Sequence, residues 1–245
     1  MEQTLLGKTA FVSGSGKNIG RGIAVRLAAL GADVVVNGSR DETACAATAA
    51  MVEGAGRQAL VAMGDMGRAE DVARVSKTVL DQFGRVDILV NNAARRPHKP
   101  FLEMTDDDWD SVVDPALTGA FRTARAFLPG MVDQGWGRII NFAGMKAIKG
   151  YFEGAPISAA KHGVWGLTKA LSTEFASKGI TANVISPGQI RKDDADADDP
   201  KRAARIPAGV MGVSDDIAAV AGFLASPGAR FVTGQMIAVN GGETT

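Results

Sequence analysis

The sequence predicts an α/β fold in which one parallel sheet is covered by helices on both faces. Seven short apolar runs rich in β-branched residues alternate with longer segments whose apolar residues recur at helical spacing, along all 245 residues of the chain. The short runs are apolar on both sides of the strand, as in parallel sheets that are buried on both faces. There is no internal repeat and no linker in the sequence, so we expect a single domain over residues 1–245.

A helix is expected between each pair of consecutive strands. The expected strands are residues 9–14, 33–38, 58–64, 86–93, 137–144, 180–188 and 234–242. The expected helices are residues 19–30, 40–53, 69–83, 107–131, 159–178 and 214–226. This alternation predicts a doubly wound sheet of the Rossmann type with about seven strands. Thr105 and Ser214 stand where helix N-caps are expected, and Gly31, Gly84 and Gly179 stand where helices are expected to end.

Charge and composition exclude several classes of protein. The 27 basic and 27 acidic side chains cancel, so no net charge draws the chain to nucleic acid or to a membrane surface. No stretch reaches the roughly 20 apolar residues of a membrane span, and the first residues lack the pattern of a signal peptide. The one cysteine, Cys45, rules out an internal disulfide and is expected to be a buried helix residue. We expect a cytoplasmic protein without nucleic-acid or membrane partners.

One segment, residues 188–209, breaks the alternating pattern. It is polar and bounded by prolines, and five aspartates lie between positions 193 and 199. Because like charges repel and little of it can be buried, we expect a mobile charged surface loop. The alternative is a lid over a ligand, since the segment follows the carboxyl end of a strand. We expect no metal site from its carboxylates.

A glycine-rich segment, SGSGKNIG at residues 13–20, joins the first expected strand to the first expected helix. Gly14 permits a tight turn, and Gly20 permits close contact between helix and strand. The free amides at the start of a helix, together with the helix dipole, favour binding of a pyrophosphate. This placement is typical of dinucleotide-binding sites.

Together with other segments, this loop makes the chain similar to the short-chain dehydrogenase/reductases over nearly its full length. Their pattern T-G-x-x-x-G-x-G corresponds to residues 13–20, with Asn18 in place of the middle glycine. NNAA at 91–94 resembles their N-N-A-G, and GRIIN at 137–141 and SPG at 186–188 are also similar to family segments. The resemblance is strongest to the acyl-carrier-protein ketoreductase and glucose-dehydrogenase-like branch. It implies an oxidoreductase that uses a nicotinamide cofactor.

The resemblance also implies where the cofactor binds and which cofactor it is. Family members that use NAD place an acidic residue after the second strand, where this chain has Gly38, followed by Ser39 and Arg40. Arg40 and Lys17 can pair with a 2′-phosphate, so NADP(H) is favoured over NAD(H), unless both cations are only solvated. The implied cofactor-binding residues are Gly14, Lys17, Asn18, Ile19, Gly20, Ser39, Arg40, Asp65, Met66, Asn91, Ala93, Lys161, Pro187, Gly188 and Ile190.

The catalytic end departs from the family. Its members reduce a carbonyl with a Tyr that donates a proton, a Ser that polarises the carbonyl, an Asn that supports a water, and a Lys. Of these only the lysine is present, as Lys161, and the implied positions of Tyr, Ser and Asn hold Ile157, Gly144 and Ala116. Pro115, just before Ala116, is expected to disturb its helix. Because an ammonium can bind the ribose hydroxyls of the cofactor, we interpret Lys161 as a cofactor ligand first.

Three side chains are candidates for the missing acid. Tyr151, the one tyrosine, lies six positions before Ile157, His98 follows the NNAA segment, and Lys146 lies on the loop after the fifth strand. Each has an ordinary alternative, which is packing for the aromatic rings and solvation for the lysine. The catalytic candidates are therefore Lys161, Lys146, Tyr151 and His98. Two functions stay open: an oxidoreductase with a rearranged acid, which could also reduce an activated C=C bond, and a catalytically silent cofactor-binding sensor or partner subunit.

Cations gather on the loops expected around the substrate cleft, at 95–99, 144–149 and 191–192. Arg95, Arg96 or Lys146 could hold an anionic substrate such as a carboxylate, a phosphate or a coenzyme A thioester, although surface cations are often only solvated. The resemblance further implies a homotetramer or homodimer that forms through helices 106–131 and 155–178.

Overall fold

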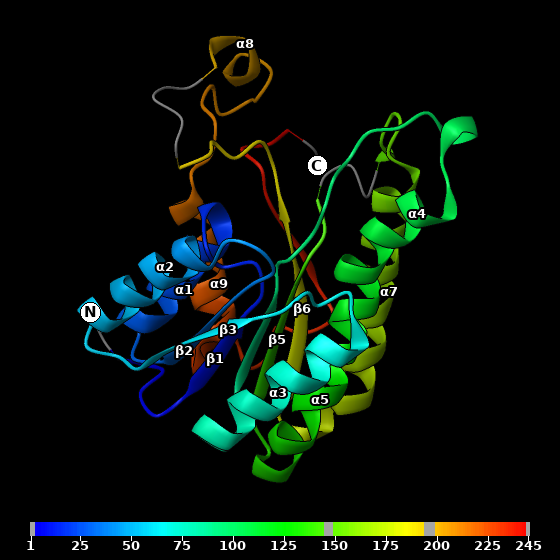
Figure 1. The fold of residues 1–245 in the computed structure, drawn as a ribbon. Coiled ribbons are helices and arrows are strands. Elements are labelled where there is room, and N and C mark those ends of the chain that lie inside the picture. Colours follow the sequence, from blue (N-terminus) through cyan, green and yellow to red (C-terminus); the bar gives the residue numbers. More distant parts are fainter. Residues whose placement is uncertain (1–2, 145–148, 194–198, 244–245) are drawn as a thin grey trace.

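The computed structural model describes residues 3–144, 149–193 and 199–243. In these ranges seven parallel strands form one sheet in the order β3-β2-β1-β4-β5-β6-β7 (Figure 1). The strands are β1 (Thr9–Val12), β2 (Asp33–Gly38), β3 (Ala59–Met63), β4 (Ile88–Asn91), β5 (Gly137–Phe142), β6 (Ile180–Pro187) and β7 (Met236–Val239). All of them lie within the runs predicted from the sequence, which confirms the predicted fold class. No helix in these three ranges is both long and apolar enough to cross a membrane.

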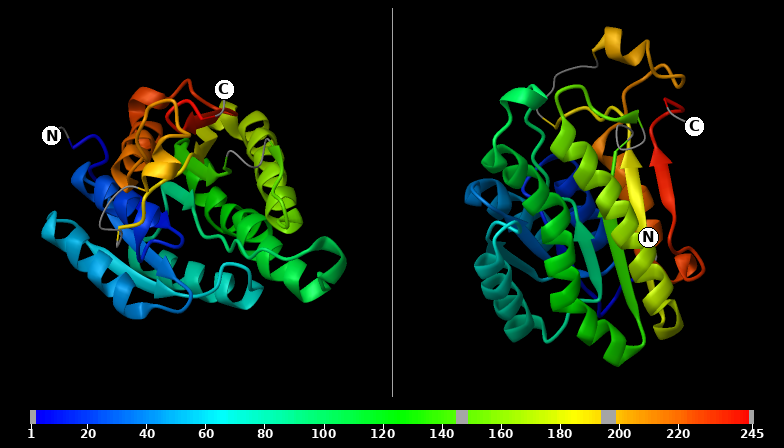
Figure 2. Two further views of the ribbon diagram at one scale, coloured as in Figure 1. Left: turned by 90° about the horizontal axis from the view of Figure 1, so that it is seen from above. Right: turned by 90° about the vertical axis from the view of Figure 1, so that its right-hand side faces the viewer.

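Helices cover both faces of the sheet, as Figure 2 shows from two further directions. One layer contains α1 (Asn18–Ala29), α2 (Glu42–Gly54) and α9 (Ser214–Ala225). The other contains α3 (Ala69–Phe83), α5 (Gly119–Gln134) and α7 (Ala155–Phe175). Neighbouring residues of β1 alternate between the layers, so Val12 joins the core of the first and Phe11 the core of the second. The strands are apolar on both sides because each side has its own core.

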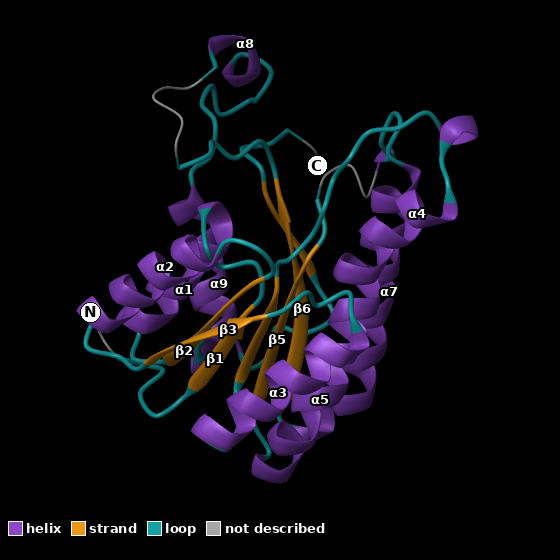
Figure 3. Cartoon of the chain, viewed as in Figure 1, coloured by secondary structure: helices purple, strands orange, loops and turns teal. Residues whose placement is uncertain are grey.

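The strand order places a crevice at the carboxyl end of β1. Val12 of β1 is in register with Val36 of β2 on one side and with Val90 of β4 on the other. The chain therefore leaves β1 and β4 toward opposite halves of the sheet, and doubly wound sheets bind their ligands at such a point. The glycine-rich segment 13–20 lies at this edge, above the strands in Figure 3.

The predicted helix 107–131 is interrupted at Pro115. The chain passes from α4 (Asp106–Val113) into a π-helical turn, Asp114–Thr118, before α5 begins. Proline has no N–H for the helical ladder and its ring collides with the preceding turn, which accounts for the widened turn. The predicted disturbance is confirmed, and Ala116 is buried within this turn.

Most of the predicted helix ends are also found. The hydroxyl of Thr105 caps α4 by accepting from the amide three residues on at 3.2 Å. Gly84 and Gly179 adopt the left-handed conformation, with φ of 73° and 75°. Ser214 differs from the prediction, because it is the first residue of α9 and its hydroxyl donates instead to the carboxylate of Asp193 at 2.9 Å.

The segment 188–209 is folded where the structure describes it. After α8 (Pro200–Ala203), Ile206 and Met211 pack with Ala203 in a small apolar cluster. The amide of Ala208 donates to the carbonyl of Gly241 at 3.0 Å, so this segment rests on the C-terminal residues. Three of its aspartates, Asp194, Asp196 and Asp198, lie outside the described residues, and the mobility of the loop stays a prediction.

Candidate active site

The glycine-rich segment 13–20, called the cofactor loop from here on, leaves β1 and includes the first residues of α1, which begins at Asn18. Gly14 has φ 63° and Asn18 has φ 51°, both in the left-handed region. Asparagine adopts this region more readily than most residues that carry a side chain, which explains how it replaces a glycine here. At Gly20 a Cβ would lie 2.8 Å from the Cα of Ser15 and would collide with the carbonyl oxygen of Gly14. The backbone here therefore requires glycine at position 20 and accepts asparagine at position 18.

Gly20→Ala is expected to abolish cofactor binding and to lower the free energy of unfolding by about 3 kcal/mol, because the added methyl group meets backbone atoms. Titration with NADPH and chemical denaturation measure the two effects. Gly54→Ala, in the last turn of α2, is the matched control, since a Cβ there meets no atom within 4 Å. A Gly20→Ala variant that binds NADPH like the wild type would contradict the assignment of this loop.

The segment after β4 supports the loop. Nδ2 of Asn92 donates to the carbonyl oxygens of Ser13 and Gly14, at 3.0 Å and 2.9 Å. Oγ of Ser13 accepts in return from the amides of Asn92 and Ala93, at 3.0 Å and 3.1 Å. Sequence reasoning missed Asn92 as a supporting residue, although its place after the strand next to β1 was the available signal. The side chain of Asn91 is hydrogen-bonded to the side chains of Thr123 and Asn141 instead. Asn91 would therefore contact a cofactor through its backbone.

A cavity of about 310 Å³ adjoins the loop on the side of β2 and β3. The predicted cofactor-binding residues that line it are Gly14, Lys17, Ser39, Arg40, Asp65, Met66 and Ala93. At Gly38 a Cβ would collide with Sγ of Cys45, which is buried as predicted. Burial, followed by the charges of Asp41 and Glu42, raises the pKa of the Cys45 thiol. An acidic side chain therefore has no space at position 38.

Arg95 lies at this smaller cavity and not in the substrate cleft where its sequence position suggested it. Its Nη2 donates to the carboxylate of Asp65 at 2.6 Å, and this ion pair turns Arg95 toward the cofactor side. The amide of Gly67 donates to the other oxygen of Asp65 at 2.9 Å. Nζ of Lys17 lies 3.9 Å from the carboxylate of Asp41, and both side chains are more than half exposed. Of the three cations among the described residues that line the smaller cavity, Lys17 and Arg95 each lie beside a carboxylate, and Arg40 is the third.

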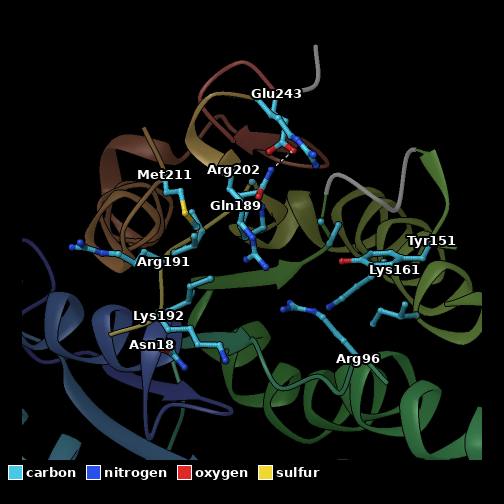
Figure 4. A pocket seen from close by; sticks show the side chains of 18 residues that line it. Asn18, Arg96, Tyr151, Lys161, Gln189, Arg191, Lys192, Arg202, Met211 and Glu243 are labelled. Carbon is cyan, nitrogen blue, oxygen red and sulfur yellow. Dashed lines mark hydrogen bonds between the residues drawn. The ribbon is translucent and has the colours of Figure 1, made fainter. Parts of the chain in front are cut away.

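A second cavity, of about 670 Å³, lies at the carboxyl ends of β5 and β6 (Figure 4). The predicted site residues that line it are Asn18, Ile19, Tyr151, Lys161, Pro187, Gly188 and Ile190. Lys161 is 4% exposed, and its Nζ donates to the carbonyl oxygen of Phe142 at 2.7 Å. Burial, and after it the charge of Arg96, lowers the pKa of Lys161 to about 7. An ammonium has three donors, so Lys161 can hydrogen-bond a ligand while it keeps this contact.

The three positions at which the family resemblance implies a Tyr, a Ser and an Asn present no polar side chain to this cavity. Ile157 lines it and is 2% exposed. A Cβ at Gly144 would meet no atom of the described residues within 4 Å. Ala116 is buried in the π-helical turn. None of these three residues has a side chain that can donate a proton.

Tyr151 brings a hydroxyl to this cavity from another position. Figure 4 shows its hydroxyl directed into the cavity that Lys161 also lines. The backbone amide of Tyr151 donates to Oγ of Ser158 at 2.9 Å, and its ring centroid lies 5.7 Å from that of His98. His98 is exposed, with Nδ1 3.2 Å from the carbonyl oxygen of Phe152, and is not among the described residues that line the cavity. Lys146 lies outside the described residues.

Five more cations line the larger cavity: Arg96, Arg191, Lys192, Arg202 and Arg205. Sequence analysis singled out the first three as cleft residues and missed Arg202 and Arg205, which follow the acidic run. Their spacing of three residues, which brings side chains to one side of a helical turn, was the available signal. Glu243 is the acidic residue among the described lining residues, and its Oε1 accepts from Nε2 of Gln189 at 2.8 Å. The part of the cavity wall that the structure describes is therefore strongly cationic.

Comparisons with known proteins identify the family of this chain. A family model described as Enoyl-(Acyl carrier protein) reductase matches residues 14–244. A 3-oxoacyl-(acyl-carrier-protein) reductase of Synechocystis sp. is 37% identical over 240 residues, which are 97% of each chain. The chain belongs to the short-chain dehydrogenase/reductase family. A 3-oxoacyl-(acyl-carrier-protein) reductase of Vibrio cholerae is likewise 37% identical, over 97% of this chain and 98% of its own. The resemblance seen in the sequence motifs is confirmed.

Solved structures of this family share the whole architecture. A structure from Sinorhizobium meliloti 1021, described as a short-chain alcohol dehydrogenase, superposes with a TM-score of 0.92 at 36% identity and covers 99% of this chain and 98% of its own. A structure from Agrobacterium tumefaciens, described as a gluconate dehydrogenase, has a TM-score of 0.91 at 34% identity, with 99% and 98% covered. The chain is thus a member of an oxidoreductase family and shares the fold of these structures over nearly its whole length.

Proposed function

We propose that this chain is an NADP(H)-dependent oxidoreductase with a non-standard active site that acts on an anionic substrate. The observation that carries the proposal is that Tyr151 and the buried Lys161 line one cationic cavity beside an intact cofactor loop. Tyr151 takes the role of proton donor that Ile157 cannot fill. The names of the relatives, which are reductases, support the class of reaction.

The residues present fit a dinucleotide that spans both cavities. The smaller cavity takes the adenosine half, where Arg40 and Lys17 would pair with a 2′-phosphate and Gly38 offers no carboxylate. The backbone at Gly14 and Gly20 has the close approach that a pyrophosphate loop needs. Lys161 would bind the ribose hydroxyls of the nicotinamide half, in the larger cavity.

Arg40→Ala and Lys17→Ala are each expected to weaken NADPH binding about tenfold while NADH binding changes less than twofold, because only NADPH carries the 2′-phosphate. Isothermal titration of both cofactors against each variant measures the difference. Arg230→Ala, which removes an exposed cation on the loop after α9, is the control. Tighter binding of NADH than of NADPH by the wild type would overturn the cofactor assignment.

The chemistry of the side chains follows from their positions. When bound, the cofactor supplies a hydride to the carbon that is reduced. Tyr151 supplies the proton that completes the reduction, and the resulting tyrosinate regains a proton from water. Arg96 and Lys161 stabilise the negative charge that the hydride brings, in a cavity whose other cations hold the anionic group of the substrate.

The excess of cationic over acidic side chains among the described residues that line the larger cavity indicates the charge of the substrate. Arg96, Arg191 and Lys192 lie on two loops, while Arg202 and Arg205 belong to the segment around α8, so one anionic group can be approached from several sides. Guanidinium groups bind carboxylates and phosphates in bidentate geometry. A carboxylate, a phosphate or a coenzyme A thioester fits this wall better than a neutral ketone.

The consumption of NADPH tests the proposal directly. We expect 3-oxo acids, α,β-unsaturated acids or their coenzyme A thioesters to be reduced at least tenfold faster than the matching methyl esters, followed by absorbance at 340 nm. Faster reduction of the methyl esters would contradict the proposal that the substrate is anionic. The apolar residues at positions 157, 144 and 116 favour one second function, a silent NADP(H)-binding sensor or partner subunit. NADPH binding without consumption by any compound of the panel would select it.

We also propose that the chain forms a homotetramer or homodimer through α4, α5 and α7. Trp109 of α4 and Phe121 of α5 are 38% and 45% exposed, although they are large apolar side chains. A second copy would cover them. Light scattering of the purified protein tests this, and a monomeric mass would contradict it.

A further inference from the structure

We propose that the carboxylate of Asp193 holds the phosphate position at the start of α1, and that the cofactor must displace it to bind. This autoinhibitory contact rests on the proposed function, since it concerns the same cofactor loop. It would make Asp193 a regulator of cofactor affinity.

The carboxylate of Asp193 is held by three other residues. Its Oδ2 accepts from the backbone amide of Asn18 at 2.6 Å and lies 3.6 Å from Nη1 of Arg21. Its Oδ1 accepts from the hydroxyl of Ser214 at 2.9 Å. The amide of Asp193 donates in turn to Oδ1 of Asn18 at 3.0 Å, so the two residues are bonded in both directions. Asn18 and Asp193 are 175 positions apart, and this contact depends on the folded chain.

The start of α1 lacks an anion of its own. Its first turn holds no acidic residue, and the N-cap Lys17 offers no side-chain acceptor. The dipole of a helix of 12 residues and its free amides favour an anion at this end. Asp193 supplies that anion from outside the helix, in place of a cofactor phosphate.

The contact lies between the two cavities. Lys17 lines the smaller cavity, and Asn18 and Ile19 line the larger one. A dinucleotide with its adenosine half in one cavity and its nicotinamide half in the other places its pyrophosphate between them, at the amide of Asn18. A carboxylate and a phosphate cannot share one amide donor, since their like charges repel at contact distance. Binding of the cofactor therefore requires Asp193 to leave.

Two variants separate this competition from a simple change in charge. Asp193→Asn keeps the shape of the side chain and removes its charge, and we expect it to bind NADPH at least fivefold more tightly than the wild type. Ser214→Ala changes no charge but removes one of the donors that hold the carboxylate, and we expect a smaller gain in affinity, about twofold. Asp215→Asn removes an exposed charge next to Ser214 and is the charge-matched control, with affinity unchanged.

Two further measurements are the affinity for a ligand without a pyrophosphate and the melting temperature of the cofactor-free protein. Adenosine 2′-monophosphate has no pyrophosphate, so its affinity is expected to be the same for the wild type and Asp193→Asn. The melting temperature of the cofactor-free protein is expected to fall in Asp193→Asn, so stability and NADPH affinity change in opposite directions.

Isothermal titration and thermal melting decide between the outcomes. Equal or weaker NADPH binding by Asp193→Asn, with normal binding by the wild type, would overturn the inference and leave the proposed function intact. An equal gain in affinity for Asp215→Asn would also overturn it, because general electrostatics would then suffice. Absence of NADPH binding by the wild type and all variants would overturn the proposed function together with this inference.

Discussion

Tyr151→Phe is expected to consume NADPH at least 100-fold more slowly than the wild type with the best substrate of the panel, while it binds NADPH equally well. The substitution removes only the hydroxyl that points into the larger cavity (Figure 4). The ring that packs beside Gly154 and His98 is retained. A positioned proton donor contributes roughly 10²- to 10⁴-fold to a rate, and the chain has no other tyrosine to replace it. Single-turnover kinetics with saturating NADPH measure the loss.

Ser158→Ala serves as a graded companion to this variant. Ser158 accepts from the backbone amide of Tyr151, so its loss is expected to displace the tyrosine and lower the rate by about tenfold without removing the acid. Phe152→Leu, at the exposed neighbouring residue, is the control and is expected to keep the wild-type rate. Full activity in Tyr151→Phe would assign the proton to water or to another side chain.

The fold was predictable because its determinants are local. A parallel strand covered on both faces needs apolar side chains in succession, so each of the seven strands is visible as a short run in the sequence. Pro115 disturbs the helix around it because proline has no backbone N–H and its ring collides with the preceding turn. The π-helical turn lies at that residue. Asn18 could be aligned with a glycine, because the left-handed conformation found there is the one that both residues tolerate.

The direction of side chains at the site was not predictable in the same way. Arg95 and Arg96 are neighbours on one loop, but Arg95 turns to Asp65 at the smaller cavity while Arg96 lines the larger one. The partner that decides this is 30 positions away in the sequence. Arg202 and Arg205 reach the larger cavity because their segment packs on the C-terminal residues. Their spacing in the sequence indicates that they share one side of a turn, but it does not indicate which cavity that side meets.

Lys161 was predictable only in part. Its presence and its implied role could be read from the family motif, but the extent of its burial could not. In the structure it is almost completely enclosed and its ammonium donates to the carbonyl of Phe142. The lowered pKa of Lys161 is a consequence of this packing. It leads us to expect that the stability of the protein depends on pH, which the sequence alone does not predict.

Lys161 is expected to make the free energy of unfolding rise between about pH 7 and pH 9.5. Burial holds its pKa at about 7 in the folded protein, against 10.5 for an exposed lysine. Over this range the unfolded chain binds one more proton than the folded chain, so stability increases with pH, by up to about 1.4 kcal/mol per unit and about 3 kcal/mol in all. Lys161→Met keeps an unbranched side chain of similar length and removes the titrating group. Chemical denaturation of both proteins across this range measures the difference in slope.

The direction in which stability changes with pH distinguishes a buried lysine from a lysine in an ion pair. Below pH 7 the folded state carries the whole cost of a desolvated ammonium, and above pH 10.5 it carries none. A lysine stabilised by an acidic partner would give the opposite slope, with stability lost as the pH rises. Subtracting the Lys161→Met curve cancels the titration of the groups that do not interact with Lys161. Parallel curves would contradict the shifted pKa, whereas a rising difference together with about tenfold weaker NADPH binding by Lys161→Met would establish one buried lysine as both the pH-sensitive group and the cofactor ligand.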